Sequence, residues 1–234
     1  MAASAYATSD SLYYSHASVG PAASITDYPF TLACWCRLDS ISGSTDSVIA
    51  LTDASGSGSG TNWWQINDRD MSGNVGFRIR SETSDGTDDT TDYDTGQTFG
   101  DGHWFHVVAT FRSSTDRELY IDGVSRATAT ATATFSQPDT VGWSIGNSGK
   151  VLTGAVTHIS LYDAGLSVDE VNNIMYDPLS IPKNLIWCIP CQQTAYGSTA
   201  SNYKDVSGNG WNCTAAGSCA ADDDGPPIYA PQQL

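Results

Sequence analysis

Short runs of alternating apolar and polar residues recur along the chain, and a period of two is typical of β-strands that bury one face. The clearest run is Phe30–Leu38, in which one face collects Phe30, Leu32, Cys34 and Cys36. An edge strand is expected around Leu12–Tyr14. The pattern predicts further strands at Ser47–Leu51, Trp63–Asn67, Val75–Arg80, His103–Phe111, Glu118–Val124, Ala127–Phe135, Val141–Ile145 and Ala155–Tyr162.

Turn residues join several of these strands. A hairpin is expected to close around Ser72-Gly73-Asn74, and Asp122-Gly123 is typical of a tight hairpin that tolerates positive φ. Ser84–Gly96 holds five Asp residues and has no apolar period, which predicts a solvated loop. One helix is expected after Ser167, which forms a capping box with Glu170, and Pro178 ends it. The chain is therefore expected to be an all-β, antiparallel β-sandwich with one short helix.

The charge balance limits the kinds of partner that the chain can bind. The chain of 234 residues carries 26 Asp and Glu against 10 Lys and Arg, a net charge of −16. Such a surface repels phosphate backbones and anionic lipids, so nucleic acid is excluded as a partner. No apolar run is long enough to insert into a membrane. The first residues lack the basic and apolar regions of a signal peptide, which leaves a removed leader or another route outward, such as assembly into a virus particle.

The six cysteines do not form a simple disulfide framework. Cys34 and Cys36 point to the same face of a predicted strand and are expected to be small buried residues. Cys188 and Cys191 have CxxC spacing without the βαβ setting of a redox site. Cys213 and Cys219 flank a short loop and are the best candidates for a disulfide.

Several blocks of the chain resemble the laminin-G-like family of jelly-roll sandwiches. The blocks are Phe30–Arg37, Trp104–Phe111 followed by Leu119–Gly123, and Ile145–Gly154 followed by Ile159–Asp163 and the helix start at Leu166-Ser167. The resemblance implies a concanavalin A-like β-sandwich. It also extends, in general features, to domains found in tailed-phage virion proteins.

The order of the family's motifs differs from the usual one. The family opens with an apolar strand and Asp-x-Ser-Gly-Asn-Gly, whereas here these features come near the end, in Asn184–Ile189 and Asp205–Gly210. The order therefore looks circularly permuted. We expect a laminin-G-like sandwich over residues 1–176 and a C-terminal extension over 177–234, of which 184–216 completes the same sandwich. The Asp that the family often carries after its conserved Gly is absent, because Thr157 and His158 follow Gly154-Ala155-Val156.

Enzymes of this fold carry motifs that are incomplete here. No two of Glu82, Glu118 and Glu170 are close enough in sequence to be a glycosidase pair. Polysaccharide lyases resemble the chain at Arg80-Ser81-Glu82 and Gln65-Ile66, but Asn67 occupies the position of their His. The four histidines are scattered and lack zinc spacing. The chain is expected not to be an enzyme.

The sequence offers candidate ligands for a metal ion and, separately, aromatic residues that could contact a glycan or a protein. Calcium is the most plausible cofactor, with tentative ligands Asp205 and Asn209 in one loop and Asp89, Asp92 and Asp94 in another. The alternatives are an Asx-type turn at Asp205 and a plain acidic loop.

Tryptophans are the candidates for contact with a glycan or a partner protein. Trp63 and Trp64 point to opposite faces, so one is expected in the core and the other exposed, and Trp211 is a further candidate. Ordinary cover of the sandwich edge is the alternative.

These features leave a ranked set of functions. The first is a non-catalytic virion structural or adhesive protein, such as a capsid decoration, fibre or appendage subunit, that binds virion proteins or itself as a homo-oligomer, and a host surface glycan. The alternative is a secreted carbohydrate-binding lectin module, and a polysaccharide-degrading enzyme is a distant third. The expected location is the virion surface or the extracellular space.

Overall fold

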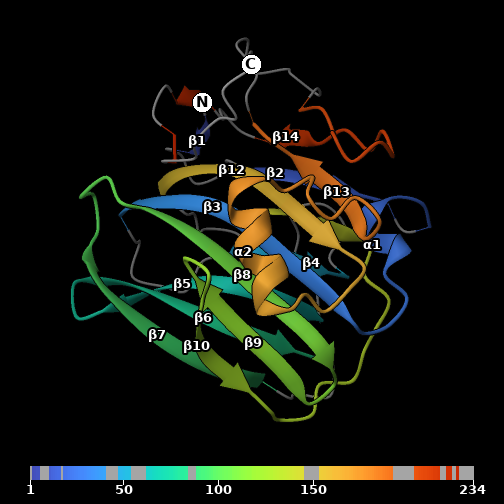
Figure 1. Ribbon diagram of the computed structural model, residues 1–234, viewed down its shortest axis with the longest axis horizontal. Coiled ribbons are helices and arrows are strands. Elements are labelled where there is room, and N and C mark those ends of the chain that lie inside the picture. Colours follow the sequence, from blue (N-terminus) through green and yellow to red (C-terminus); the bar gives the residue numbers. More distant parts are fainter. Residues whose placement is uncertain are drawn as a thin grey trace.

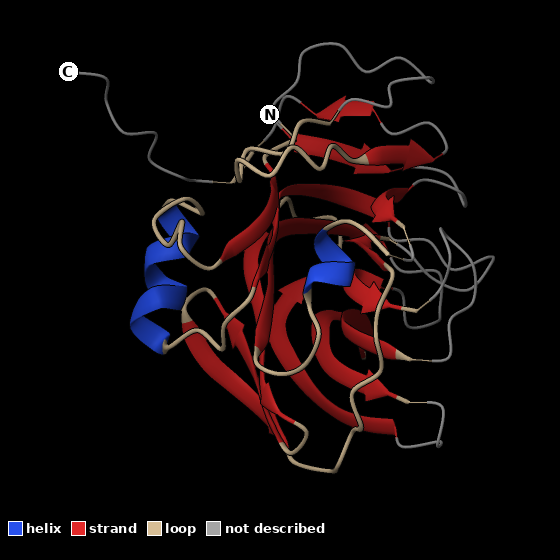
Figure 2. Cartoon of the chain, turned by 90° about the vertical axis from the view of Figure 1, so that its right-hand side faces the viewer, coloured by secondary structure: helices blue, strands red, loops and turns tan. Residues whose placement is uncertain are grey.

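The chain forms two antiparallel sheets packed face to face (Figures 1 and 2). The computed structural model describes residues 2–5, 11–16, 18–40, 47–53, 62–83, 88–144, 153–191, 203–216, 220–222 and 225–226. The first sheet has eight strands: β10 (Val124–Ala129), β9 (Asp116–Ile121), β8 (Trp104–Ser113), β3 (Phe30–Ser40), β12 (Thr153–Tyr162), β1 (Ala2–Ala5) and β15 (Ala220–Asp222), with β13 (Leu185–Ile189) also paired to β12. The second has seven: β14 (Thr214–Ala216), β2 (Ser11–Ser15), β11 (Thr140–Trp143), β4 (Ser47–Thr52), β5 (Trp63–Met71), β6 (Asn74–Glu82) and β7 (Asp88–Thr98).

Strand β3 shows why the core lies between the sheets. Its alternate residues Phe30, Leu32, Cys34 and Cys36 are buried in the main core, as the period of two predicts. The opposite side of β3 is buried too, because α2 (Val168–Tyr176) covers the outer face of the first sheet. Cys34 and Cys36 are small buried residues, as expected.

The two predicted hairpin turns are confirmed. Ser72 and Gly73 have φ of 63° and 97° between β5 and β6, and Asp122 and Gly123 have φ of 51° and 75° between β9 and β10. Positive φ at both central residues matches the right-handed twist of the flanking strands. These turns set the register of both hairpins.

The predicted helix is confirmed, and a second helix was not foreseen. Ser167 caps α2, and Glu170 completes the capping box. Val171 and Ile174 of α2 pack on the outer face of the first sheet. The second helix, α1 (Pro21–Ser24), has four residues, too few to show an apolar period in the sequence.

Strand β7 lies where the sequence predicts a solvated loop, at Ser84–Gly96, and this prediction is wrong over the described residues. Residues 88–98 form an eleven-residue strand that pairs with β6 alone in its sheet. An edge strand needs little apolar surface, because only one of its sides is paired. In β7, Tyr93 packs against the main core. Thr91 Oγ1 donates to the Thr128 carbonyl at 2.9 Å, which links β7 to β10 where the two sheets meet.

Two further predictions about strands were wrong in part. β2 was expected at an edge, but β14 pairs with its outer side. The strand expected over Ala127–Phe135 ends at Ala129, because the segment that follows bonds to turns rather than to a neighbouring strand.

The C-terminal segment contributes to both sheets. β13 pairs with β12 through Ile159–Tyr162, while β1 pairs with the same edge of β12 through Gly154–Val156. Trp187 and Ile189 of β13 lie in the main core. β14 joins the second sheet. β13 and β14 therefore add strands to the sandwich that residues before 177 begin.

The CxxC cysteines face different surroundings. Cys188 lies under α2 with Tyr162, and Cys191 lies in the main core. Burial raises the pKa of the Cys188 thiol to about 12. This arrangement is structural. The expected Cys213–Cys219 disulfide lies outside the described residues, because Cys219 is not among them.

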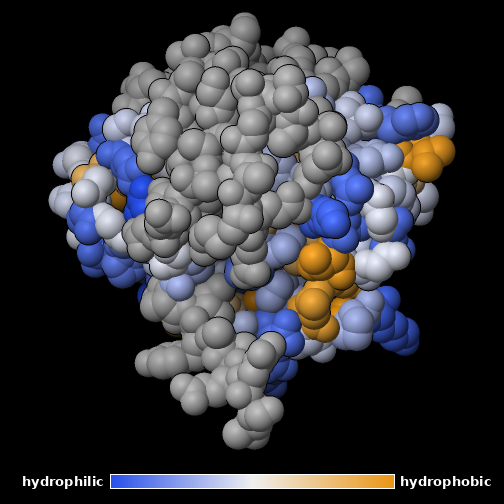
Figure 3. Space-filling view, turned by 90° about the horizontal axis from the view of Figure 1, so that it is seen from above, coloured by the Kyte–Doolittle hydropathy of each residue, from blue (hydrophilic) through white to orange (hydrophobic). Residues whose placement is uncertain are grey.

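The described residues on the upper face of the molecule are mostly hydrophilic. Seen from above, they are blue to white with a few orange areas (Figure 3). Among the described residues, the exposed large hydrophobic side chains are Val19, Val124, Val168, Tyr176, Leu179 and Val206. Neither helix of the described chain is long and apolar enough to cross a membrane.

Candidate functional site

The outer face of the second sheet gathers polar side chains in rows across β4, β5, β6 and β7. In β5, Trp64 and Ile66 point into the main core, so Trp63, Gln65 and Asn67 point outward. The strand register places Gln65 beside Arg80 and Asn67 beside Arg78. On such a face, the polar groups that reach solvent can donate and accept hydrogen bonds with a ligand laid across the strands.

The centre of this face is buried. Gln65, Asn67 and Ser47 have at most 7% of their surface exposed, and Ser47 donates a hydrogen bond to Gln65 Oε1. Polar groups this far from solvent keep a fixed orientation when they are hydrogen-bonded.

Beside it lies a more open strip of charge, which we call the arginine strip: Arg69, Arg78, Arg80 and Asp92. Arg78 Nη2 donates to Asp92 Oδ2 at 2.9 Å, Arg78 Nε also donates to Asp92, and Arg69 Nε lies 3.5 Å from Asp92 Oδ2. Arg80 pairs with Glu82 at 2.9 Å. The side chains of the strip are between 19% and 32% exposed.

The charges of the strip favour ionised carboxylates. The Arg78 guanidinium, which hydrogen-bonds Asp92, lowers the pKa of that carboxyl. Three of the ten basic residues of this acidic chain lie here. Guanidinium groups and a carboxylate side by side can together donate to and accept from neighbouring hydroxyl groups.

Comparison with known proteins fixes the family. The model of the concanavalin A-like lectin/glucanases superfamily matches residues 11–172. The chain belongs to this superfamily. The resemblance expected from Phe30–Arg37 and the later blocks is thus confirmed, and the two sheets are those of a lectin-like sandwich. A search of curated proteins found no relative that matches.

Solved structures share the lectin-like sandwich at low identity. A Bacteroides ovatus protein assigned to carbohydrate binding aligns with a TM-score of 0.60 and 12% identity over 97% of this chain. The chain spans 61% of the length of that protein. The CBM40 of Ruminococcus gnavus IT-sialidase, bound to α2,3 sialyllactose, aligns with a TM-score of 0.51 and 17% identity over 70% of this chain and 92% of its own. These likenesses show the fold.

The tryptophans predicted to contact a glycan or partner protein expose little of their surface, and their contacts stay a prediction. Trp64 lies in the main core, and Trp63, although it points outward, is 5% exposed beside Ala50 and Tyr13. The expectation that one of the pair is exposed was wrong, because alternation gives the direction of a side chain and not what covers it. Trp211 is half-buried against the core, and its carbonyl accepts a bond from Trp187 Nε1 at 2.7 Å.

The predicted calcium ligands of the second loop have protein partners. Asp205 Oδ1 accepts from the Cys188 and Ser207 amides at 3.1 and 2.9 Å, and Oδ2 accepts from Ser207 Oγ and the Trp211 amide at 2.8 and 3.0 Å. Asn209 Nδ2 donates to the Ile186 carbonyl at 2.8 Å. The alternative of an Asx-type turn therefore describes this loop well.

The other calcium candidates lie on the edge strand β7. Asp92 bonds to Arg78, and Asp94 accepts from the Gly96 amide at 2.8 Å and from Asn74 Nδ2 at 3.3 Å. The side chain of Asp89 lies outside the described residues. Within the part of the chain that the structure describes, no three His, Cys, Asp or Glu residues cluster in a way that could hold a metal. Calcium stays a prediction, and the melting temperature with and without Ca²⁺ tests it.

The sequence pointed to two residues of the arginine strip, but in other roles. Arg80 was part of the lyase-like Arg80-Ser81-Glu82, and Asp92 was a tentative calcium ligand. Arg69 and Arg78 were not predicted as site residues. The alternation in Val75–Arg80 places Arg78 and Arg80 on one face and was the available signal. The partner Asp92 was hidden because β7 was expected to be a loop.

Proposed function

We propose that the chain is a non-catalytic carbohydrate-binding module that holds an oligosaccharide against the arginine strip. The observation that carries the proposal is the strip itself, with part-exposed donors and acceptors side by side on one face of a lectin-like sandwich. The B. ovatus protein assigned to carbohydrate binding and the sialyllactose-bound CBM40 support this interpretation of the fold.

The chemistry of the face favours binding over catalysis. Glycoside hydrolysis needs one carboxyl group that keeps its proton near neutral pH. On this face Asp92 is held ionised by Arg78, and Glu82 is paired with Arg80. The lyase-like residues are also incomplete, since Ser81 is buried and Asn67 lies where a His would be needed.

This proposal replaces the virion reading as the main one. Neither solved structure compared above is a virion protein, whereas both concern carbohydrate binding. A surface or extracellular location agrees with such a module. The virion role and self-association stay predictions.

The direct test is a glycan array followed by isothermal titration of the best hit. Arg78→Gln should weaken binding by roughly tenfold or more, since a buried or part-buried charge-assisted contact is worth about 1.5–3 kcal/mol. Lys183→Gln makes the same change of charge at an exposed position away from the second sheet and should bind like the wild type. Equal affinity of both variants would refute the strip as the site. Release of products from laminarin, alginate or agar would refute the non-catalytic reading.

A further inference from the structure

A separate groove opens at one end of the sandwich. It has a volume of about 460 Å³ and is lined by Asp27, Tyr28, Ser113, Thr132, Thr134 and Phe135, with Arg112 and Ser114 beside them. These residues come from the segment before β3, the end of β8 and the segment after β10. None of them belongs to the arginine strip. The groove is shallow and largely open to solvent, so a ligand there would lie against its lining rather than be enclosed by it.

The floor of the groove is aromatic and held in place. Tyr28 stacks on Phe30 with ring centroids 5.6 Å apart, and Phe135 packs edge-on against Tyr28 at 5.6 Å. The Tyr28 hydroxyl accepts from Trp64 Nε1 and donates to the Ala133 carbonyl, both at 2.9 Å. Tyr28 and Phe135 are half-buried, so each presents part of a fixed ring to the groove.

The wall after β10 is irregular yet anchored. The Ala133 amide donates to the Ser114 carbonyl at 2.9 Å, and Gln137 Nε2 donates to the Ile25 carbonyl at 2.9 Å. The fully buried Arg117 donates to the Ser114 carbonyl at 2.9 Å and also to the Ala131 carbonyl. A wall fixed in this way lowers the entropy lost when a ligand binds.

The alternating Ala and Thr residues of 127–135 contribute to this wall. The alternation that runs through β10 continues beyond its end, so that Thr132 and Thr134 are exposed while Ala133 is buried. Both hydroxyl-bearing residues line the groove. A stretch of low complexity thus delivers two hydroxyl groups to the same opening.

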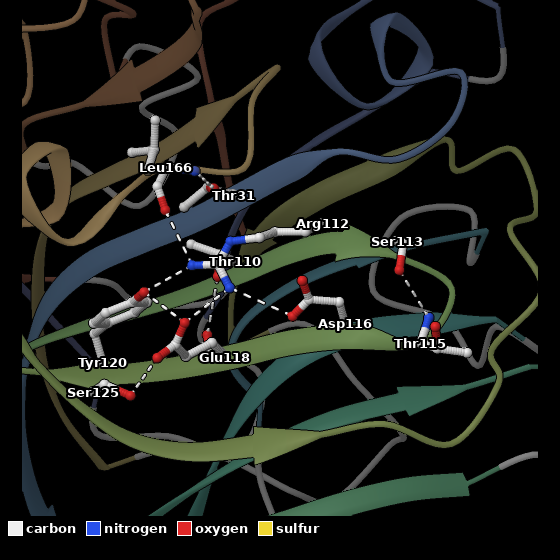
Figure 4. A network of polar contacts seen from close by, with 10 residues as sticks. All are labelled: Thr31, Thr110, Arg112, Ser113, Thr115, Asp116, Glu118, Tyr120, Ser125 and Leu166. Carbon is white, nitrogen blue, oxygen red and sulfur yellow. Dashed lines mark hydrogen bonds and ion pairs between the residues drawn. The ribbon is translucent and has the colours of Figure 1, made fainter.

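The charge of the groove disfavours anions. Figure 4 shows the Arg112 guanidinium enclosed by acceptors: Glu118 Oε2 and the Tyr120 hydroxyl at 2.8 Å, the Leu166 carbonyl at 3.4 Å and Asp116 Oδ1 at 3.5 Å. Its charge is therefore compensated by its neighbours. Asp27 is exposed, and its Oδ1 accepts only from its own neighbour, the Tyr28 amide at 2.7 Å, among the contacts of the described residues. The charge that reaches solvent at the groove without an ion pair is therefore the Asp27 carboxylate, because the Arg117 guanidinium is fully buried behind the wall.

We propose that this end groove is a second saccharide site, which takes a neutral sugar ring with adjacent hydroxyl groups. The Asp27 carboxylate accepts from two sugar hydroxyls, the Thr132 and Thr134 hydroxyls exchange hydrogen bonds with others, and Phe135 and Tyr28 contact the apolar C–H face of the ring. A sugar that carries a carboxylate or sulfate is repelled by Asp27.

The test is an amide NMR titration of the full chain with cellohexaose and mannohexaose, and with an oligogalacturonate as the anionic comparison. The neutral probes should shift the amides of residues 27–28, 112–114 and 132–135, and the anionic probe should not. The double change Thr132→Ala and Thr134→Ala, and separately Asp27→Asn, should weaken the neutral probes by roughly tenfold, as expected for lost hydrogen bonds of about 1.4 kcal/mol.

Two matched controls separate this site from the arginine strip. Thr130→Ala changes an exposed threonine of the same repeat that does not line the groove, and should bind like the wild type. Arg78→Gln should leave the groove shifts unchanged even if it abolishes binding at the strip. The second site is refuted if neither neutral probe shifts the groove amides at about 10 mM, a concentration that exceeds the Kd of weak sugar sites. It is also refuted if the groove variants bind as the wild type does, or if Arg78→Gln removes the groove shifts.

Discussion

At the scale of single residues, two histidines of the first sheet, His106 and His158, have pKa values well below the usual one. His106 is 2% exposed on the outer face of the first sheet, beside the Trp35 ring at 5.3 Å. Burial lowers the pKa of His106 to about 3 and that of His158 to about 4. Both imidazoles are therefore neutral in the folded protein near pH 7.

These histidines make the protein sensitive to mild acid. The unfolded chain takes up protons on His below about pH 6.5, whereas the folded chain resists until pH 3–4. Folding stability should therefore fall as the pH is lowered from 6.5 towards 4, by up to roughly 1.4 kcal/mol per pH unit for His106. Urea unfolding at pH 7, 6 and 5 should show a flatter dependence in His106→Gln. An identical slope in both proteins would contradict this account.

Asp205 is expected to be a stabilising residue through its four hydrogen bonds. Asp205→Ala leaves the Cys188 and Trp211 amides without their acceptor, so we expect a loss of roughly 2–4 kcal/mol in the free energy of unfolding. Asp163→Ala removes an exposed carboxylate elsewhere and should cost less than about 0.5 kcal/mol. Equal urea midpoints for the two variants would argue against the structural role of Asp205.

The sequence was informative about single residues where the signal is local. The capping box at Ser167 and Glu170 needs residues three apart, and the structure contains it. The pairing of Arg78 with Asp92 depends instead on the register between two strands, which no short pattern specifies. Burial of Trp63 depends on what covers the outer face of the sheet. Alternation along one strand gives the direction of a side chain but not its cover.

At the level of elements, the two confirmed hairpins differ in their surroundings. Gly73 and Gly123 both have positive φ, and a Cβ at Gly73 would meet no atom within 4 Å. A Cβ at Gly123 would lie 2.0 Å from Asn172 Oδ1, on the helix that covers the first sheet. The β9–β10 turn is therefore packed beneath α2, whereas the β5–β6 turn is open.

This difference predicts unequal costs for the same substitution. Gly73→Ala should destabilise the protein by about 1–2 kcal/mol, the usual cost of a left-handed conformation for an L-residue. Gly123→Ala pays that cost and also displaces Asn172, whose Nδ2 bonds to the Val168 carbonyl at 2.9 Å, adding roughly 0.5–1.5 kcal/mol. Thermal melts of the two variants measure the difference. If Gly73→Ala is the less stable variant, α2 does not pack on the β9–β10 turn as described.

Central strands were predicted better than edge strands, for a physical reason. β3 and β8 are buried on both sides of the first sheet and carry apolar residues that reveal them. β7 keeps its place mainly through backbone bonds to β6, so its sequence of Asp and Thr resembles a loop. The four-residue β1 and three-residue β15 are too short to show any period.

At the scale of the whole molecule, one core joins segments from both halves of the chain. Trp187 and Ile189 of β13 share the main core with Phe30 and Trp64. The region matched by the family model, residues 11–172, therefore lacks part of the sandwich. It should not fold alone into the same structure.

Removal of residues 184–234 should abolish cooperative unfolding or make the protein insoluble, because it exposes the β12 edge and empties part of the core. Trp187→Ala tests the same contact within the intact chain and should cost roughly 3–5 kcal/mol. Calorimetry and urea unfolding measure both. A shortened chain that melts sharply near the full-length temperature would show that the segment is an appendage.

The pairing of β1 has a consequence for how the molecule is made. β1 lies between β12 and β15, with Ala2 opposite Asp222, so its two edges are satisfied by strands that lie far along the chain. During synthesis β1 has neither of these partners until β12 and then β15 have been made. Contacts of such long sequence separation form slowly, because the entropy of closing the loop is lost before they stabilise it. The central hairpins can form during synthesis, whereas β1 is secured only after β12 and β15 have been made.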